Sequence, residues 1–391
     1  MASARADRPR PERIPMFLAL RELRFARSRF SLMGGVVALI AVLMVVLSGL
    51  SSGLVNDGVS GLKNQPVDAF AFAGGTKTDS AFSRSIVDLG QVTTWAAQPD
   101  VADAAPFGSM LVNAHSSAGA PVDLALFGVE PGSFIDPHVA DGQALGADDG
   151  IVVSQTVLDD GLAIGDTVTI DRIGTTLTII GTTGNQHTFG HVDVAYLPLT
   201  TWQEIHSGAA AGEQVRPDAY TEASAVALRA VDGATLDLAA GDAAAGTSSM
   251  TLTESFGASP GYTAETSTLL LIQVFLYAIS ALVVGAFFTV WTIQRRQELA
   301  VLRAMGGSTG YLMRDGLAQA LIVLVASSAV GVAIGVAGGG LLSGTAMPFA
   351  LEAPAIVLAF ALLVVLGTVG AAFAIARIAK VDPLKALGGQ R

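Results

Sequence analysis

The stretch Ser31–Val55, SLMGGVVALIAVLMVVLSGLSSGLV, decides the class of this protein. After Ser31, its only polar side chains are the hydroxyls of Ser48, Ser51 and Ser52. A hydrocarbon core of about 30 Å requires roughly 20 consecutive apolar residues in a helix, because a helix satisfies its backbone hydrogen bonds internally. The stretch therefore predicts a membrane-spanning helix over residues 31–55. It is too long for the apolar region of a signal peptide, and we expect it to be retained.

Three further apolar stretches follow, over residues 267–293, 317–342 and 355–376. None of the four contains Asp, Glu, Lys, Arg or His. Such residues normally form the proton relays and ion sites of coupled carriers, so the sequence disfavours a carrier of that kind. The chain as a whole is 51% hydrophobic and 14% charged, as in a multi-pass membrane protein.

The basic residues predict the orientation of these helices. Sixteen of the 22 Lys and Arg residues precede the first stretch, separate the second from the third, or follow the fourth. The positive-inside rule places those segments, and hence both termini, on the cytoplasmic side of the cell membrane. Residues 56–266 are then extracytoplasmic. They carry 26 of the 33 acidic residues, which disfavours nucleic acid as a partner.

These assignments divide the whole chain into segments. In order, we predict a disordered basic tail (1–15), an amphipathic interfacial helix (16–30), the first transmembrane helix (31–55), the extracytoplasmic domain (56–266), the second helix (267–293), a cytoplasmic segment (294–316), the third helix (317–342), a short external loop (343–354), the fourth helix (355–376) and a cytoplasmic tail (377–391).

The extracytoplasmic segment is long enough to bury its own core, and its patterns are mixed. Short apolar runs punctuated by glycine predict strands at 151–153, 167–170, 176–180 and 192–197. Together they indicate a β-rich subdomain near residues 143–200. Residues 79–97 and 200–207 favour helices, whereas the small residues of 239–249 favour a loop. The predicted fold is an α-helical membrane protein with four transmembrane helices plus an α+β extracytoplasmic domain inserted between helices 1 and 2.

The cytoplasmic run RRQELAVLRAMGGS, residues 295–308, is the most informative motif in the chain. Leu299, Leu302 and Met305 recur on one side of an amphipathic helix that ends at paired glycines. By composition alone, the run is a solvated turn with positive-inside charges. It also resembles the cytoplasmic coupling segment of FtsX/MacB-type ABC transporter permeases, with Gly307 in place of the usual alanine.

Other parts of the chain support the same resemblance. The ending DPLKAL at 382–387 is similar to the closing motif of that family, and IVVS at 151–154 and YLPLTTW at 196–202 resemble its small β-rich external subdomain. The likeness covers most of residues 16–387. Within the family, the start MFLALREL at 16–23 resembles the haem-exporting permeases of Gram-positive bacteria.

The resemblance implies a non-catalytic permease subunit that pairs with a second copy, contacts membrane lipids and docks a separate cytoplasmic ABC ATPase. It assigns the ATPase contact to Arg295, Arg296, Glu298, Leu302, Arg303, Met305 and Gly306. None of the four lysines of the chain follows a glycine, so the chain has no P-loop and the partner subunit must bind ATP. The implied activity is efflux of a hydrophobic or amphipathic substrate, with haem as the candidate, and no intrinsic cofactor is expected.

Glu22 and Met44 are the candidate substrate-binding residues, because a carboxylate and a thioether can both ligate haem iron. An ordinary interfacial salt bridge is the favoured alternative for Glu22, and simple packing is the favoured alternative for Met44. Two other activities within the family stay open. One is transmission of force to an external hydrolase or sensor, as in FtsX-like members, and the other is extraction of lipid or lipoprotein.

The third helix carries three glycines at four-residue spacing, Gly331, Gly335 and Gly339. They form a face without side chains, which another helix can approach closely. Packing within one subunit and contact with a second copy both account for such a face.

The five histidines, His115, His138, His187, His191 and His206, all lie in the external segment. His187 and His191 would share one face of a helix, as in a metal-binding pair. The glycine at 190 and the neighbouring strand patterns argue against a helix there, so we interpret them as surface or loop histidines. The chain contains no cysteine, which excludes disulfides and thiolate sites. No metal site and no catalytic residue are predicted.

Overall fold

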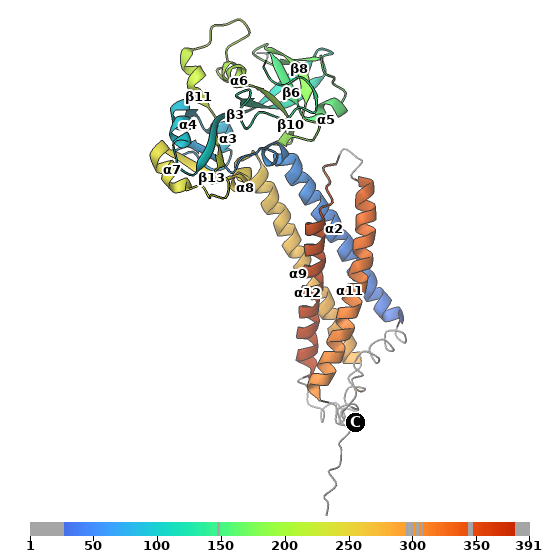
Figure 1. Cartoon of the computed structure of the whole chain (residues 1–391). Helices are drawn as coiled ribbons and strands as arrows, with labels where there is room; N and C mark the ends of the chain where they lie inside the picture. Colours follow the sequence, from blue (N-terminus) through green and yellow to red (C-terminus); the bar gives the residue numbers. More distant parts are fainter. Residues whose placement is uncertain are drawn as a thin grey trace, which may run out of the picture. The chain divides into compact units, whose positions relative to one another are not determined.

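The computed structural model describes residues 27–146, 149–294, 297, 301, 305, 308–342 and 347–379. The chain forms two compact units (Figure 1). The helical unit comprises Met1–Ser52 with Thr268–Arg391, and the α+β unit comprises Gly53–Ser267. The predicted basic tail and most of the predicted interfacial helix lie outside the described residues.

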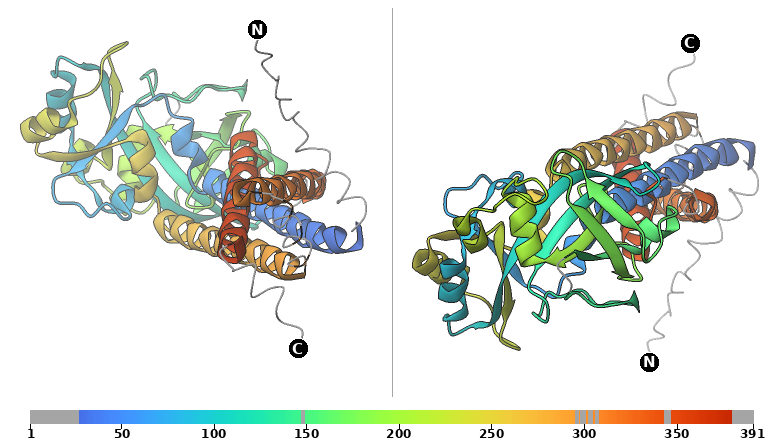
Figure 2. Two further views of the ribbon diagram at one scale, coloured as in Figure 1. Left: turned by 90° about the horizontal axis from the view of Figure 1, so that it is seen from below. Right: turned by 90° about the horizontal axis from the view of Figure 1, so that it is seen from above.

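Four helices among the described residues are long and apolar enough to cross a membrane, as predicted. They are α2 (Arg27–Lys63), α9 (Tyr262–Gln294), α11 (Thr309–Leu342) and α12 (Ala353–Ala379). Their parts within the helical unit run side by side (Figures 1 and 2). Both α2 and α9 extend beyond their apolar stretches and contribute residues to the α+β unit, because helical hydrogen bonding continues where the side chains become polar.

The glycine face of α11 packs against its own chain. A Cβ atom at Gly331 would lie 2.3 Å from the carbonyl oxygen of Ala38 in α2, and one at Gly335 would also meet α2, at 2.8 Å. A Cβ atom at Gly339 would lie 2.7 Å from the ring of Phe349, which precedes α12. These distances leave no room for a side chain, so the glycines allow close approach between elements of one subunit.

A mixed sheet organises the α+β unit, in the order β13-β1-β12-β3-β4-β10-β6-β8-β5. Its strands are β1 (Ala69–Ala73), β3 (Val101–Ser116), β4 (Pro121–Val129), β5 (Asp141–Gly142), β6 (Gly150–Val153), β8 (Thr176–Thr182), β10 (Val192–Pro198), β12 (Ala225–Ala230) and β13 (Thr247–Thr251), with β7 (Thr167–Ile170) beside β3 and β8 and β9 (Thr188–Phe189) beside β10. The β4–β10 and β6–β8 pairs are parallel. A separate pair joins β2 (Val87–Asp88) to β11 (Glu222–Ala223).

The long strand β3 joins the two halves of the sheet. Its first half pairs with β12, and its second half pairs with β4 from Gly108 onward. Gly108 lies opposite Gly128 of β4, and the ring of Trp202 in α6 (Leu199–His206) occupies the space that their missing side chains leave. The sheet therefore extends beyond the subdomain predicted at residues 143–200.

The predicted loop at 239–249 is wrong, because α7 (Leu238–Ala245) and β13 occupy it. Asp237 caps α7 by accepting a hydrogen bond from the amide of Ala240 at 3.0 Å, and Gly246 ends the helix at φ +67°. Alanine has the highest helix propensity, so small residues between two caps form a helix. The other helices of the unit are α3 (Ala81–Arg84), α4 (Leu89–Ala96), α5 (Gln155–Asp159), α8 (Leu252–Ser255), η1 (Pro217–Thr221) and η2 (Phe256–Ala258).

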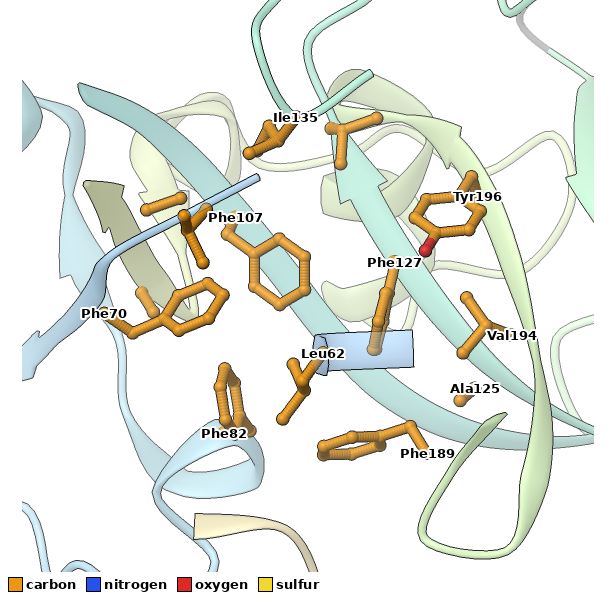
Figure 3. Packing of buried hydrophobic residues seen from close by; sticks show 14 of the residues in the cluster. Leu62, Phe70, Phe82, Phe107, Ala125, Phe127, Ile135, Phe189, Val194 and Tyr196 are labelled. Atoms are coloured by element: carbon orange, nitrogen blue, oxygen red, sulfur yellow. The ribbon is translucent and has the colours of Figure 1, made fainter. Parts of the chain in front are cut away.

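Aromatic side chains fill the core of the α+β unit (Figure 3). Contacts between ring centroids 4.8 to 5.9 Å apart link Phe70, Phe82, Phe107, Phe127 and Phe189. Leu62, from the last turns of α2, is fully buried in the same cluster. The end of α2 is therefore part of the hydrophobic core of this unit.

Candidate functional site

A cavity of about 610 Å³ lies in the helical unit and is lined by α2, α9 and α12. This volume is within the range of about 300–1,000 Å³ that is typical of small-molecule sites. Most of the lining is aliphatic. Its polar or polarisable side chains are Met44, Ser48, Ser51 and Ser52 from α2 and Gln273 and Tyr277 from α9.

Two of the helices that line the cavity, α9 and α12, approach each other closely beside it. At Gly370 of α12, a Cβ atom would lie 2.4 Å from the carbonyl oxygen of Ala281 in α9. On one side of this crossing large rings fill the bundle, and Phe30 of α2 contacts Trp291 at 5.7 Å between ring centroids. The part of α9 and α12 that lines the cavity carries small side chains, such as Ala278 and Ala359, among larger aliphatic ones such as Leu362.

The lining can hold an amphipathic molecule. Its aliphatic walls suit an apolar body, and the hydroxyls of Ser48, Ser51 and Ser52 with the amide of Gln273 offer hydrogen bonds to polar groups. Met44 is buried in the structure and lines this cavity. Met and Tyr are both known ligands of haem iron, so Met44 and Tyr277 are the lining side chains that could reach a metal centre. Reasoning from sequence missed Tyr277, because an isolated aromatic residue in an apolar helix gives no local signal.

The remaining candidate residues are placed as follows. Glu22 lies outside the described residues, as do Arg295, Arg296, Glu298, Leu302, Arg303 and Gly306. Within the coupling segment, Met305 is described and its side chain is 72% exposed. The segment therefore presents at least one large apolar side chain at the surface of this chain.

A row of hydrogen bonds joins the end of α2 to the β9–β10 hairpin within the α+β unit. The buried hydroxyl of Ser60 lies 2.7 Å from that of Thr188 and accepts a hydrogen bond from the backbone amide of Thr188 at 2.9 Å. The amide of Gly190 donates to the carbonyl of Gly58 at 2.9 Å. With the burial of Leu62, these contacts fix the end of α2 to the sheet.

A second network lies deeper along the same contact. The hydroxyl of Tyr196 accepts a hydrogen bond from Nε2 of Gln65 at 2.9 Å and lies 2.7 Å from Nδ1 of His187. Burial raises the pKa of Tyr196, and burial lowers the pKa of His187 to about 4. His187 is therefore neutral at pH 7, and its Nδ1 can accept a hydrogen bond from the Tyr196 hydroxyl. The two histidines singled out in the sequence serve separate interactions, because His191 lies at the turn of the hairpin instead.

Two family models match consecutive parts of the chain. A MacB-like periplasmic core domain matches residues 30–245, and an FtsX-like permease C-terminal region matches residues 270–383.

Individual relatives are similar over nearly the whole length. A putative hemin transport system permease protein, HrtB, of Staphylococcus haemolyticus is 23% identical over 378 residues, which is 96% of this chain and 99% of that protein. An uncharacterized ABC transporter permease of Mycobacterium tuberculosis is 24% identical over 381 residues, with the same coverage. Among solved structures, the periplasmic region of MacB from Actinobacillus actinomycetemcomitans covers 49% of this chain and 92% of that chain, at 13% identity and a TM-score of 0.36.

Proposed function

This chain belongs to the FtsX/MacB type of ABC transporter permease, and from that premise we propose that it couples a separate cytoplasmic ATPase to the efflux of an amphipathic substrate, with haem as the candidate cargo. The observation that carries the proposal is the cavity between α2, α9 and α12. The similarity to permeases named for hemin transport supports haem in particular.

The chemistry of the cavity agrees with such a cargo. Haem combines a large apolar ring system with two carboxylates and an iron that accepts axial ligands. The aliphatic walls would receive the ring, Ser51 and Gln273 would face the polar groups, and Met44 or Tyr277 would approach the iron. Because the lining belongs to helices of the helical unit that are long and apolar enough to cross a membrane, a molecule that partitions into lipid could enter from the side.

The coupling route follows from the proposed orientation, in which both termini are cytoplasmic and the α+β unit is outside. The ATPase would bind the segment at 295–308, which follows α9. Helix α9 lines the cavity and also supplies residues to the α+β unit, so nucleotide-driven movement at one end could alter the cavity and the external domain together. Two copies of the chain would pair, each with its own ATPase subunit.

Filling the cavity tests the site. In the complex with its ATPase, reconstituted in nanodiscs, Ala359→Trp should abolish the haem absorption band and reduce haem stimulation of ATP hydrolysis at least about tenfold, since Ala359 is buried and lines the cavity. Val357→Trp is the matched control, because Val357 is an exposed residue of the same helix. Haem binding by Ala359→Trp equal to that of the control would exclude this cavity as the site.

Ligation and coupling have their own variants. Met44→Leu conserves volume, so it should shift the haem spectrum without loss of thermal stability if Met44 ligates the iron, and leave the spectrum unchanged if Met44 only packs. Glu298→Arg should weaken copurification with the ATPase, whereas Gln297→Arg, at an exposed neighbouring position, should not. Unchanged association and stimulation in Glu298→Arg would remove that residue from the coupling role.

The attachment of α2 to the core of the α+β unit also favours a second candidate function, force transmission to an external hydrolase or sensor. Leu62 and Ser60 join the end of α2 to the sheet, so displacement of α2 must move the sheet or break those contacts. Lipid or lipoprotein extraction would use the same movement. A chain that binds its ATPase but shows no haem band and no haem stimulation would favour these alternatives.

A further inference from the structure

His191 lies between two carboxylates, one from α2 and one from α9, the two helices that contribute residues both to the helical unit and to the α+β unit. Its Nδ1 is 2.8 Å from Oδ2 of Asp57 in α2, and its Nε2 is 2.9 Å from Oε2 of Glu265 in the first turn of α9. All three residues belong to the α+β unit. One imidazole therefore connects α2, the β9–β10 hairpin and α9.

The geometry requires a particular protonation state. A neutral imidazole carries one N–H and can donate to only one carboxylate, whereas an imidazolium donates from both nitrogens. Ionised carboxylates accept hydrogen bonds but have none to donate. With both carboxylates ionised, the two short contacts are hydrogen bonds together only when His191 is protonated.

The backbone holds the ring in this position. Gly190 and His191 form the two-residue turn between β9 and β10, and both have positive φ, +59° and +65°. Glycine and asparagine are the usual residues of such a turn, and a larger side chain with positive φ is uncommon. The turn is fixed to α2 by the hydrogen bond from Gly190 to Gly58. A strained residue whose side chain makes two charged contacts indicates a specific role for that side chain.

Among the described residues, the charged groups that face His191 are carboxylates. They are Asp57 from α2 and Glu265 from α9, whereas on the hairpin itself Asp193 bonds instead to Thr156. Partial burial lowers the pKa of His191, but the hydrogen bonds and charges of the two carboxylates outweigh it and the pKa is raised overall. The ring and both carboxylates reach solvent, so protons can exchange with the external medium.

We propose that Asp57, His191 and Glu265 form a proton-dependent latch, which holds the first turn of α9 to the end of α2 when His191 is protonated and releases α9 when it is neutral. The link to Glu265 is the one that opens. Asp57 keeps a second hydrogen bond, from Nε2 of Gln186 to its Oδ1 at 3.2 Å, and its side chain is 25% exposed against 41% for Glu265. On the proposed function, external alkalinity would then free α9 to move separately from α2 during the ATPase cycle.

Spin labels can follow the latch directly, because the chain has no native cysteine. Val55→Cys in α2 and Ser267→Cys in α9 provide a label pair for electron paramagnetic resonance in nanodiscs, with no ATPase or substrate present. The distance distribution should be narrow at pH 5.5 and gain a second, longer component by pH 9. His191→Gln should show both components at every pH, whereas His115→Gln, which alters an exposed His–Asp pair elsewhere in the unit, should behave as the wild type.

Carboxylate variants separate a latch from a merely structural contact. Asp57→Asn removes one charge that favours protonation of His191, so the pH midpoint of the transition should fall by about one unit or more. Glu265→Gln removes the charged partner of the link that opens, so its distance distribution should no longer depend on pH. A purely structural contact would weaken equally at all pH values. The proposal would be overturned if the label-to-label distances of the wild type did not depend on pH, or if the wild type and His191→Gln gave the same distances. Because the readout needs neither ATPase nor haem, that failure would leave the transport proposal intact.

Discussion

Leu62→Ala tests whether the end of α2 is anchored in the core of the α+β unit. The substitution removes three buried carbons, and at about 0.8 kcal/mol for each the transfer term alone is roughly 2.5 kcal/mol. The rings of Phe82, Phe107 and Phe127, in the same cluster, already pack against one another, with ring centroids 5.9 and 4.8 Å apart, so we expect them to fill the space only in part. The cavity term therefore raises the expected loss of stability to about 4 kcal/mol.

The loss should appear as a lowered unfolding temperature of the α+β unit. At roughly 2–4 °C per kcal/mol for a domain of this size, the midpoint should fall by about 8–16 °C. Two of the three tryptophans, Trp95 and Trp202, are buried in this unit, so in a Trp291→Phe background the tryptophan fluorescence of the full chain in nanodiscs reports its unfolding. Leu111→Ala is the control, because Leu111 is an exposed leucine of the same sheet, and its midpoint should fall by only about 2 °C. Equal midpoints for the two variants would refute the anchoring of α2.

Two further outcomes follow from the same structure. Gly331→Ala places a Cβ atom 2.3 Å from the backbone of α2 and should destabilise the helical unit by about 1–3 kcal/mol. Gly338→Ala is the control and should not destabilise it, because a Cβ atom there would have no neighbour within 4 Å. Equal thermal midpoints for the two variants would contradict the close contact between α2 and α11. In the folded chain His187 stays neutral down to about pH 4, whereas in the unfolded chain it binds a proton below about pH 6.5. The free energy of unfolding should therefore fall by up to about 3 kcal/mol as the pH drops from about 6.5 to about 4. His187→Gln should remove this part of the pH dependence of unfolding, and an unchanged slope would contradict the assignment.

Local sequence was sufficient to predict the membrane helices and four strands. A segment enters lipid because of its own apolar content, so residues 31–55 predict a helix whatever the rest of the chain does. The runs at 167–170 and 176–180 likewise alternate strongly enough to be recognised as strands, and they correspond to β7 and β8. The motif at 295–308 indicated the permease family, which the family models confirm.

The strands of the first half of the sheet were not predicted. In β3 and β4 the paired glycines at 108 and 128 weaken the apolar alternation, and their role is apparent only beside Trp202, which is distant in sequence. The loop expected at 239–249 was wrong for a different, local reason, since the alanines of this segment favour a helix once Asp237 and Gly246 cap its ends.

The apolar runs, the charge distribution and the coupling motif determined by themselves that this is a four-helix permease with an inserted domain. Only the tertiary structure showed the cavity of the helical unit and how the end of α2 is held. The cavity is lined by α2, α9 and α12, which are far apart in the sequence, and His191 meets carboxylates 134 and 74 positions away. Such contacts arise from the folded path of the whole chain, which the periodicity of short segments does not encode.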